Sequence, residues 1–430
     1  MRGADGDPVV IRNAPLLFDG TPMPTLYWLV GPAEKRLVDR LEAAGGVRLA
    51  ESRVSGEAVA AGHAIYAEER DRALPADWSG PRPSGGVAGT RQGVKCLHAH
   101  YAWFLAGGPD PVGRWVADQL NGFDRPAAAI DCGTNSTRLL VAQPGGRPLE
   151  RINRITRLGQ GVDTSRRLAP EAIERTLAAL RAYRQVMDRL EVGRVRMTAT
   201  SAARDASNRQ EFFDAAEAIV GVRPELLPGD EEGRLSFAGA TAELEPQSGP
   251  WLVVDIGGGS TELVLGPDSD GSPTAVRSLD VGCVRLTERF LAGDPPTPES
   301  VGRARAFTSD LLEQAIRDDP RFLEARALVG LAGTVASLAA ADQGIRGYER
   351  ERVHHYRLTA PRVEAILDRL ASATAAQRRE MAGIEPARAD VIVGGTIVLS
   401  EVMRRFGYEV CLTSEADILD GLILNLYGRL

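Results

Sequence analysis

Lysine is almost absent from this chain, and that scarcity excludes a class of phosphate site. Lys35 and Lys95 are the only lysines among 51 basic residues, so nearly all positive charge is carried by arginine. The sequence contains no Gly-Lys-Ser/Thr phosphate loop. The dinucleotide-binding fingerprint is also missing, because Glu262 stands where a third glycine should follow Gly257 and Gly259. The commonest nucleotide-hydrolase and dinucleotide motifs are therefore excluded.

Paired cysteines and long apolar runs are lacking as well. The start of the chain has no basic-then-apolar secretion signal, and no apolar run approaches bilayer length. We therefore expect a cytoplasmic protein that does not bind membranes.

A net charge of −7 argues against a nucleic-acid partner, so any polyanion must meet a local basic surface. The cysteines lie far apart, which is typical of a reducing compartment and predicts no disulfide framework: Cys96, Cys132, Cys283 and Cys411.

Two stretches of the sequence are near copies of each other. Residues 129–140 read AIDCGTNSTRLL, and residues 253–264 read VVDIGGGSTELV. Each predicts a buried strand that ends in an aspartate, a small polar turn and a second strand. Such turns leave backbone N–H groups and hydroxyls free for phosphate oxygens, while the strand-end carboxylates of Asp131 and Asp255 suit a hard cation or a water. One copy alone is equally well explained as an ordinary hairpin, but two aligned copies favour two lobes that grip a phosphorylated substrate.

The length of 430 residues predicts two or three packed units. We place a small domain at residues 1–121, a linker at 121–126, and two lobes at 126–250 and 251–430. From residue 127 onward strands and helices alternate, which is the pattern of an α/β protein. The individual elements that we expect are strands at 22–30, 194–200 and 327–331, a helix at 33–44, and helices that open at Pro170 and near Glu211 and Glu231; residues 94–105 fit either period.

Three further polar clusters fall where a strand or loop leads into a helix, the usual place for ligand groups in α/β folds. In residues 199–208 we favour Arg204 as a phosphate ligand, although Ser and Asn there serve equally as helix caps. Residues 229–234 place carboxylates in a first helical turn, where they stabilise the helix dipole but could also deprotonate a water for attack on a phosphoryl group. Residues 330–334 are either a plain helix start or a third phosphate or nucleoside contact.

With these motifs in their order, residues 127–430 resemble the exopolyphosphatase and guanosine pentaphosphate phosphohydrolase (Ppx/GppA) family. That family belongs to the actin, sugar-kinase and heat-shock chaperone ATPase superfamily. The resemblance therefore implies an α/β, two-lobed, ribonuclease H-like duplicated fold preceded by a small α+β domain. The motifs that carry it are DCGTNS at 131–136, ATSAAR at 199–204, GDEEGR at 229–234, DIGGGSTE at 255–262, VGCVRLTE at 281–288 and GLAGT at 330–334.

The resemblance also implies roles for single residues. Glu232 would be the general base, with Asp255 and Glu262 as further catalytic groups that hold or orient the water and a divalent cation, Mg²⁺ or Mn²⁺, to which Asp131 would also contribute. Arg138 occupies the place of Glu262 in the first hairpin, so the second hairpin is the catalytic one. The residues expected to bind substrate phosphates are Asn135, Ser136, Thr137, Arg204, Gly257, Gly258, Gly259, Ser260, Thr261 and Arg285.

Some features depart from the family pattern. The first signature carries Cys132 and Thr134, changes that a turn tolerates. Longer family members add a C-terminal helical domain that holds long polyphosphate and helps form the dimer, whereas this chain stops at Leu430. We still expect a homodimer, but not tight processivity on very long chains.

The first domain resembles an uncharacterised bacterial domain family that is often encoded beside exopolyphosphatases. The resemblance rests on DGTPMPTLYW at 19–28 and GTRQGVKCLHAH at 89–100. Those domains usually begin with a Cys-containing stretch that this chain lacks, which suggests a truncated start. If residues 94–105 form a strand, Cys96, His98 and His100 share a face and could bind a metal; we favour a packed or helical segment. His354 and His355 are expected at the surface.

The sequence thus predicts hydrolysis of the terminal phosphoanhydride of inorganic polyphosphate, with Glu232 taking a proton from the attacking water. A close alternative is hydrolysis of guanosine pentaphosphate by the same chemistry. A sugar or acyl kinase of the same superfamily would need a nucleoside pocket near residues 330–334. The non-enzymatic alternative is a sensor that binds polyphosphate without cleaving it. The presence of Glu232, Asp255 and Glu262 argues against it.

Overall fold

The structure is a computed structural model, and it describes residues 1–2, 6–120, 125–144, 146–244, 249–267, 273–347 and 349–427. Its contacts divide the chain into two compact units, Met1–Ala127 with Asn425–Leu430, and Ala128–Leu424. Most of the expected linker, residues 121–124, lies outside the described residues. Among the described residues, no helix combines the length and the apolar character needed to cross a membrane.

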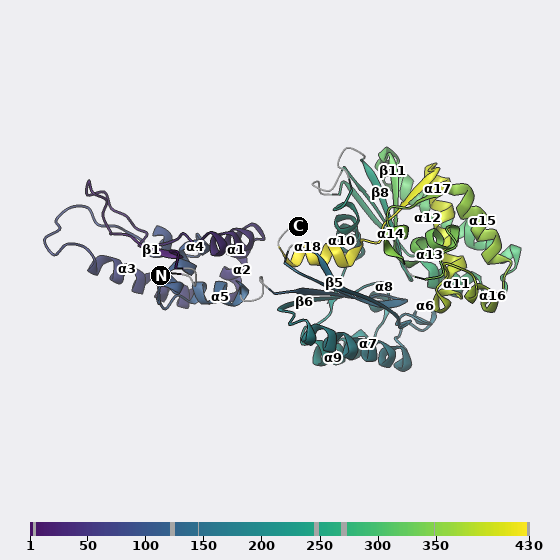
Figure 1. The fold of residues 1–430 in the computed structure, drawn as a ribbon, viewed down its shortest axis with the longest axis horizontal. Helices are drawn as coiled ribbons and strands as arrows, with labels where there is room; N and C mark the ends of the chain where they lie inside the picture. The colour runs from purple at the N-terminus through teal and green to yellow at the C-terminus, as the bar shows by residue number, and fades with distance from the viewer. Residues whose placement is uncertain are drawn as a thin grey trace. The chain divides into compact units, whose positions relative to one another are not determined.

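The N-terminal unit is mainly helical, with one short antiparallel ribbon (Figure 1). Its core is aromatic: the rings of Tyr66 and Trp103 meet edge to face at 5.0 Å, and Trp103 Nε1 donates to Glu69 at 2.9 Å. Its elements are β1 (Val10–Arg12), β2 (Tyr27–Leu29), α1 (Pro32–Ala43), α2 (Gly46–Arg53), α3 (Gly56–Arg72), the short 3₁₀ turn η1 (Val87–Gly89), α4 (Leu97–Leu105) and α5 (Pro111–Leu120).

Two expectations for this unit are refined by the structure. The strand predicted at residues 22–30 shrinks to the three residues of β2, because the prolines at its start supply no N–H for strand pairing. The ambiguous segment 94–105 is helix α4, and the helical alternative is therefore confirmed. The predicted helix at 33–44 is α1, opened by Pro32 at its first turn.

The first lobe of the larger unit is a five-stranded sheet in the order β5-β4-β3-β6-β7. Strand β3 is buried along its whole length, as expected for a strand covered on both faces. In Figure 1, α7 and α9 cover one face of this sheet. The elements of this lobe are β3 (Ala127–Cys132), β4 (Ser136–Ala142), β5 (Pro148–Ile155), α6 (Val162–Ser165), α7 (Pro170–Arg189), β6 (Arg194–Ala199), α8 (Ser201–Asp205), α9 (Arg209–Val220), β7 (Glu225–Leu226) and α10 (Gly229–Thr241).

The second lobe repeats this arrangement in a six-stranded sheet, β10-β9-β8-β11-β13-β12. Strands β8 and β9 are buried throughout, and β8 runs parallel to β11 but antiparallel to β9. Its elements are β8 (Trp251–Ile256), β9 (Thr261–Gly266), β10 (Ala275–Leu279), α11 (Cys283–Phe290), α12 (Pro298–Asp318), η3 (Pro320–Glu324), β11 (Ala327–Leu331), α13 (Ala332–Asp342), α14 (Arg350–Val353), β12 (Arg357–Thr359), α15 (Ala360–Ala371), α16 (Ala375–Arg379), η4 (Pro386–Arg388), α17 (Ile392–Phe406), β13 (Val410–Thr413) and α18 (Ile418–Leu426).

The two sheets share one topology. In each lobe the first strand lies between the second and the fourth, the third strand forms the edge beyond the second, and a helix follows the last strand of the lobe in the sequence. Helix α10 follows β7 in the first lobe, as α18 follows β13 in the second. The predicted α/β, two-lobed duplicated fold is therefore confirmed, as is the small domain that precedes it.

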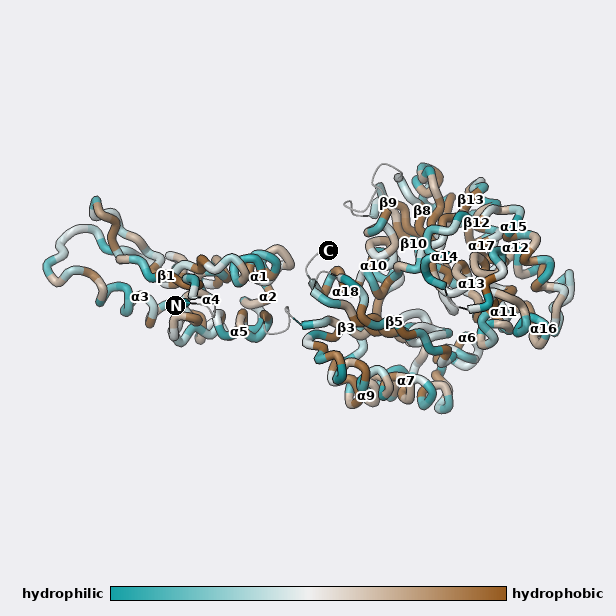
Figure 2. The backbone as a smooth tube through the Cα atoms, in the orientation of Figure 1, coloured by the Kyte–Doolittle hydropathy of each residue, from teal (hydrophilic) through white to brown (hydrophobic). Residues whose placement is uncertain are grey.

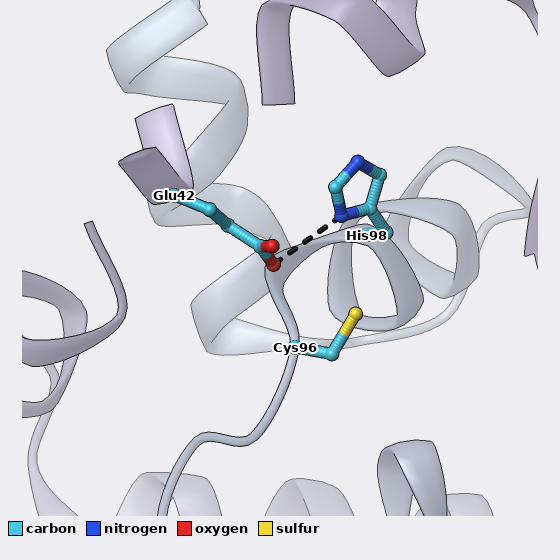
Figure 3. Close-up of side chains that lie close together, drawn as sticks. All are labelled: Glu42, Cys96 and His98. Atoms are coloured by element: carbon cyan, nitrogen blue, oxygen red, sulfur yellow. Dashed lines mark ion pairs between the residues drawn. The ribbon is translucent and has the colours of Figure 1, made fainter. Parts of the chain in front are cut away.

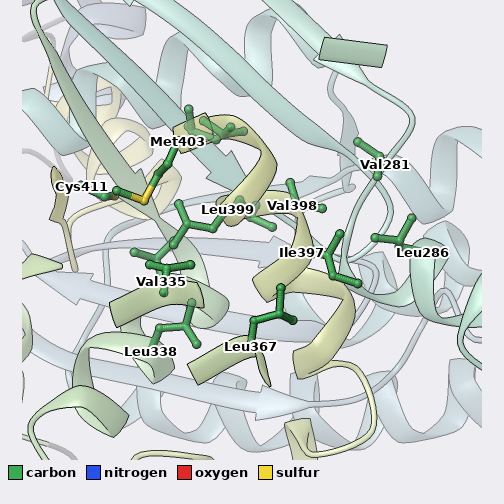
Figure 4. Close-up of a cluster of buried hydrophobic side chains, with 14 of the residues drawn as sticks. Val281, Leu286, Val335, Leu338, Leu367, Ile397, Val398, Leu399, Met403 and Cys411 are labelled. Atoms are coloured by element: carbon green, nitrogen blue, oxygen red, sulfur yellow. The ribbon is translucent and has the colours of Figure 1, made fainter. Parts of the chain in front are cut away.

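Helix α17 forms the centre of the second lobe's core. It is buried from Ile392 to Met403 and packs against α11, α12, α13 and α15. Figure 4 shows Ile397, Val398 and Leu399 of this helix among aliphatic side chains from other elements. Figure 2 shows the same contrast along the chain, with hydrophobic colour concentrated in β8 and β9 and mixed colour on the outer helices.

Helices α10 and α18 cross at two glycines between the lobes (Figure 1). A Cβ atom on Gly239 would lie 1.9 Å from the carbonyl oxygen of Asp417, and one on Gly421 would lie 2.1 Å from the carbonyl oxygen of Leu235. Any larger residue would push the helices apart. This close crossing brings the start of α10, with its three acidic residues, beside the second hairpin.

Candidate active site

The tips of the two hairpins lie against each other. A Cβ atom on Gly258 would lie 2.8 Å from Thr134 Cβ and 3.1 Å from the amide nitrogen of Asn135. A Cβ atom on Gly259 would lie 2.5 Å from Ser201 Oγ, at the start of α8. Only glycine fits in the second turn at this separation, so the glycines serve the meeting of the lobes as well as the turn.

Each turn uses one backbone amide to close itself and leaves the next amides without an acceptor among the described residues. Each is closed in the same way, since Gly133 N donates to Ser136 O and Gly257 N donates to Ser260 O, both at 3.0 Å. The turn carbonyls are occupied: Asn135 O accepts two amides of the following loop at 3.1 and 2.9 Å, as Gly258 O accepts two amides of α11 at 2.8 and 3.1 Å. In contrast, the amide N–H groups of four turn residues donate to no acceptor among the described residues: Thr134, Asn135, Gly258 and Gly259.

These free donors, together with the buried and unpartnered Nδ2 of Asn135, form an electropositive lining on both sides of the hairpin contact. Anions are stabilised by such convergent N–H groups, and phosphate oxygens accept several of them at once. The arrangement suits phosphates held between the two lobes.

Three carboxylates gather behind the second turn. Asp255 of β8 and Glu262 of β9 face each other in the antiparallel register, and both are almost fully buried. Glu232 stands in the first turn of α10, where its side chain is 12% exposed. The charges of Glu232 and Asp255 raise the pKa of Glu262, and the charge of Asp255 also raises the pKa of Glu232.

Neighbouring groups hold each carboxylate by one oxygen. Arg204 Nη1 donates to Glu232 Oε2 at 2.7 Å and to the carbonyl of Leu227 at 2.8 Å. Ser236 Oγ donates to Asp255 Oδ2 at 2.7 Å, and Ser278 Oγ donates to Glu262 Oε1 at 2.8 Å. Since each carboxylate keeps its second oxygen, the cluster is oriented but not saturated.

Burial dominates the titration of this cluster. It raises the pKa of Glu232 to about 7, against the opposing effect of the Arg204 guanidinium. It raises the pKa of Asp255 to about 6, with Arg138 opposing. Burial and the charges of Glu232 and Asp255 raise the pKa of Glu262 well above its ordinary value. A carboxylate poised near neutral pH is suited to accept a proton from water.

The first hairpin carries an ion triad in the corresponding place. Arg138 Nη2 lies 2.7 Å from Asp131 Oδ2, and its Nη1 bonds Asp417, just before α18. Burial raises the pKa of Asp131, while Arg138 lowers it. Asp131 Oδ1 is buried and has no partner among the described residues. In the first hairpin the acid Asp131 is thus paired with Arg138. In the second hairpin the acids Asp255 and Glu262 face each other, and the hairpin supplies no arginine for them.

Not every predicted phosphate ligand presents its side chain to the hairpin contact. Thr137 and Thr261 are fully buried; the hydroxyl of Thr137 pairs with Thr156 at 2.9 Å, and that of Thr261 donates to Val281 O at 2.6 Å. These two hydroxyls are engaged within the fold, and the expectation that Thr137 and Thr261 contact phosphate stays a prediction. Ser136 is half-buried at the start of β4, and Ser260 is buried at the end of the second turn.

Arg285 is also already engaged. Its Nε donates to Gly259 O at 2.7 Å, while its Nη1 and Nη2 lie 2.6 and 2.5 Å from Asp163 and Asp205 of the first lobe. Its side chain is 7% exposed, so in this structure Arg285 links the lobes, and its role as a phosphate ligand stays a prediction. A small cavity beside it is lined by Thr134, Ser201 and Gly259 as well.

The segment 330–334 is closely packed. A Cβ atom on Gly333 would lie 2.2 Å from the guanidinium carbon of Arg388, and Thr334 is buried against Gly395 of α17. The plain helix start is therefore the interpretation that the structure favours.

Sequence reasoning missed Ser236, Ser278 and Asp417. Ser236 lies four residues after Glu232 on the same helical face, so the spacing could have revealed it. Ser278 pairs with Glu262 in the β9 to β10 register, which no local motif announces. Asp417 reaches Arg138 across 279 positions of sequence and gives no local signal.

Both units of the chain match known protein families. The Ppx/GppA phosphatase family matches residues 141–430, and the family described as protein of unknown function (DUF501) matches residues 1–118. Exopolyphosphatase 2 of Mycobacterium tuberculosis is 45% identical over 317 residues, which are 70% of this chain and 98% of that protein.

Solved structures show the same relationship. The crystal structure of an exopolyphosphatase-like protein has a TM-score of 0.67 at 40% identity and covers 71% of this chain and 99% of its own. The Aquifex aeolicus member of the Ppx/GppA family has a TM-score of 0.59 at 31% identity and covers 70% of this chain and 96% of its own. The chain therefore belongs to the Ppx/GppA phosphatase family and is a hydrolase that acts on phosphoanhydrides.

Proposed function

We propose that this protein is an exopolyphosphatase, which releases phosphate from the end of inorganic polyphosphate, with Glu232 as the general base. The observation that carries the proposal is the position of Glu232. This carboxylate, whose pKa is raised, lies behind two facing turns, each of which leaves backbone amides without an acceptor among the described residues. A polyphosphate chain offers several phosphates in a row, which suits donors on both sides of one contact.

The hydrolytic step follows from these residues. The turn amides hold the terminal phosphoryl group, and Glu232 orients a water for in-line attack. Arg204 fixes one oxygen of Glu232 and leaves Oε1 to accept the proton of the water. The shortened chain is the leaving group, so no covalent intermediate is needed.

The carboxylates fit a divalent cation of the Mg²⁺ type. All donors are oxygens, Asp131 Oδ1 is buried without a partner, and the raised pKa of Glu262 reports negative charge that a cation would relieve. Among the described residues, these carboxylates do not form a group of three close enough to enclose an ion. Asp255 and Glu262 are therefore the residues that would hold Mg²⁺ jointly with substrate phosphates and water, and the cation would offset charge on the transferred group.

Phosphate release from polyphosphates of graded length, compared with guanosine pentaphosphate at equal concentration, tests the proposal. Each substrate is assayed with Mg²⁺ and with Mn²⁺, before and after chelation. We expect faster release from polyphosphate, loss of activity on chelation and recovery when Mg²⁺ returns. Release from neither substrate with either ion would contradict the proposal, and binding without release would favour the sensor.

Guanosine pentaphosphate hydrolysis is the second candidate because the matching family is named for both activities. The same turns and the same base would serve it. Preferential release from guanosine pentaphosphate would establish this alternative and leave the role of Glu232 intact.

A further inference from the structure

The N-terminal unit contains a cluster of unlike ligand groups that its packing does not require. Glu42 in the last turn of α1, Cys96 just before α4 and His98 in its first turn point toward one another (Figure 3). One ligand atom from each lies within 4.8 Å of the others. In the part of the chain that the structure describes, this is the only group of three or more such side chains close enough to share an ion.

The spacing of this cluster fits a small tetrahedral ion. His98 Nδ1 and Glu42 Oε1 lie 3.3 Å apart. Two nitrogen or oxygen ligands at about 2.1 Å from a tetrahedral zinc ion would lie about 3.4 Å from each other. The imidazole and carboxylate thus stand at the separation of two ligands, with the thiol beside them.

The other side of His98 is supported as metal-binding histidines are. Its Nε2 lies 3.0 Å from Asp39 Oδ1, one helical turn before Glu42 on α1. A histidine that binds metal through one ring nitrogen usually directs the other toward a carboxylate, which fixes the ring. Both ring nitrogens of His98 face carboxylates, so two states satisfy this arrangement: an imidazolium with two N–H groups, or a neutral ring with its N–H toward Asp39 and a metal ion at Nδ1.

Helix capping and ion pairing account for part of the set, but they leave the Cys96 thiol unused. Glu42 Oε1 accepts the amide of Leu97 at 2.6 Å, which caps α4 but uses only one carboxylate oxygen. An acid in the last turn of α1 also opposes the helix dipole, so its position there costs stability. Cys96 is the N-cap residue of α4, yet its thiol makes no capping bond. Cys96 is also the only cysteine of the chain that is not buried.

His100 takes no part in the cluster. It lies on another face of α4, is 2% exposed, and its Nδ1 bonds Asp110 at 2.7 Å. The grouping of Cys96, His98 and His100 that a strand would have produced is therefore corrected, because on a helix residues two apart point in different directions. The third ligand group of the cluster is Glu42, not His100.

We propose that the N-terminal unit binds a zinc-like divalent ion through Cys96 Sγ, His98 Nδ1 and a carboxylate oxygen of Glu42, with the fourth position open. Thiolate, imidazole and carboxylate together are a donor set typical of zinc, and three protein ligands with an open position characterise sites that exchange a water or bind a further group. Asp39 orients His98.

The test uses the full chain, stripped with a chelator and titrated with Zn²⁺ in excess Mg²⁺, so that oxygen-only sites are filled. We expect one Zn²⁺ per chain by elemental analysis. Co²⁺ in place of Zn²⁺ should give a sulfur-to-cobalt charge-transfer band, which carboxylate sites cannot produce. Because the other three cysteines are buried, a thiol reagent should modify one cysteine per chain without metal and none with Zn²⁺.

Variants locate the ion. Cys96→Ser, His98→Gln and Glu42→Gln should each lose stoichiometric Zn²⁺, and Asp39→Asn should bind about 10- to 100-fold more weakly. Glu57→Gln is the matched control, an exposed acid in the first turn of α3, and should bind like the parent. Circular dichroism of each variant without metal separates lost binding from lost folding.

Three outcomes would overturn the proposal. The first is the absence of Zn²⁺ binding by the folded parent chain. The second is cobalt binding without the sulfur band. The third is equal Zn²⁺ binding by the folded Cys96→Ser and His98→Gln variants, or a Cys96 thiol whose reactivity Zn²⁺ does not change.

Discussion

Arg138 and Glu262 occupy corresponding positions in the two hairpins and carry opposite charge. Glu262 faces Asp255 across the strand pair, whereas Arg138 lies 2.7 Å from Asp131. The first hairpin therefore pairs its strand-end acid with a positive side chain, whereas the second sets two acids opposite each other. The duplication supplies two turns of one design, and this single exchange of charge makes them unequal.

Replacing Glu232 tests the general base. We expect Glu232→Gln to bind polyphosphate but to lose turnover by about 10²- to 10⁴-fold, because the amide accepts no proton from water. Glu231→Gln is the control: Glu231 is the next residue in the same turn, but it pairs with Arg196 at 3.2 Å and is 47% exposed. Phosphate release by both variants at the parent rate would reject Glu232 as the base.

The pH profile tests the electrostatics of that base. Since Glu232 must be ionised, kcat/KM should rise with pH through its pKa of about 7. Arg204 lowers this pKa, so Arg204→Gln should move the rising limb to higher pH in addition to any effect on KM. Arg196→Gln, which removes a partner of Glu231 outside the cluster, should leave the limb in place. An Arg204 variant with an unchanged limb would show that the arginine does not act on Glu232.

Local repetition explains how much of the site could be read from the sequence. The two hairpins and the acidic start of α10 are contiguous motifs, so their residue types and spacing announced strands, turns and a helix start. Strand alternation also predicts which way single side chains face. Because Glu262 faces Asp255, its neighbour Thr261 must face the opposite side of the sheet, where it is buried.

The remaining features depend on contacts between distant segments. Asp417 and Arg138 meet only because the two lobes fold against each other. Glu42 joins Cys96 and His98 because α1 packs against α4, and a short segment with histidines two apart fits both helix and strand periods. Pairings of this kind leave no trace in a single sequence.

Removing Arg138 should destabilise the fold. Arg138→Gln leaves Asp131 buried without its counter-charge and leaves Asp417 with only the more distant Arg151, at 3.6 Å, and breaking such a buried pair costs about 3–5 kcal/mol. Without Arg138 the folded-state pKa of Asp131 rises further, so the variant loses stability as pH increases. Urea unfolding at about pH 5 and about pH 8 should therefore show the larger deficit at the higher pH. A deficit that does not depend on pH would indicate lost packing in place of unpaired charge.

The crossing of α10 and α18 should tolerate no side chain. In Gly239→Ala the new methyl group would meet the carbonyl of Asp417, and we expect a loss of at least about 1–3 kcal/mol together with lower activity, because α10 carries Glu232. Gly302→Ala is the matched control: Gly302 lies in helix α12 with no atom within 4 Å of its added Cβ, so it should gain up to about 1 kcal/mol from helix propensity. Thermal unfolding of both variants beside the parent measures the difference. Equal stability of the two would mean that the helices can separate at this point without cost, and the close crossing would not be what positions Glu232.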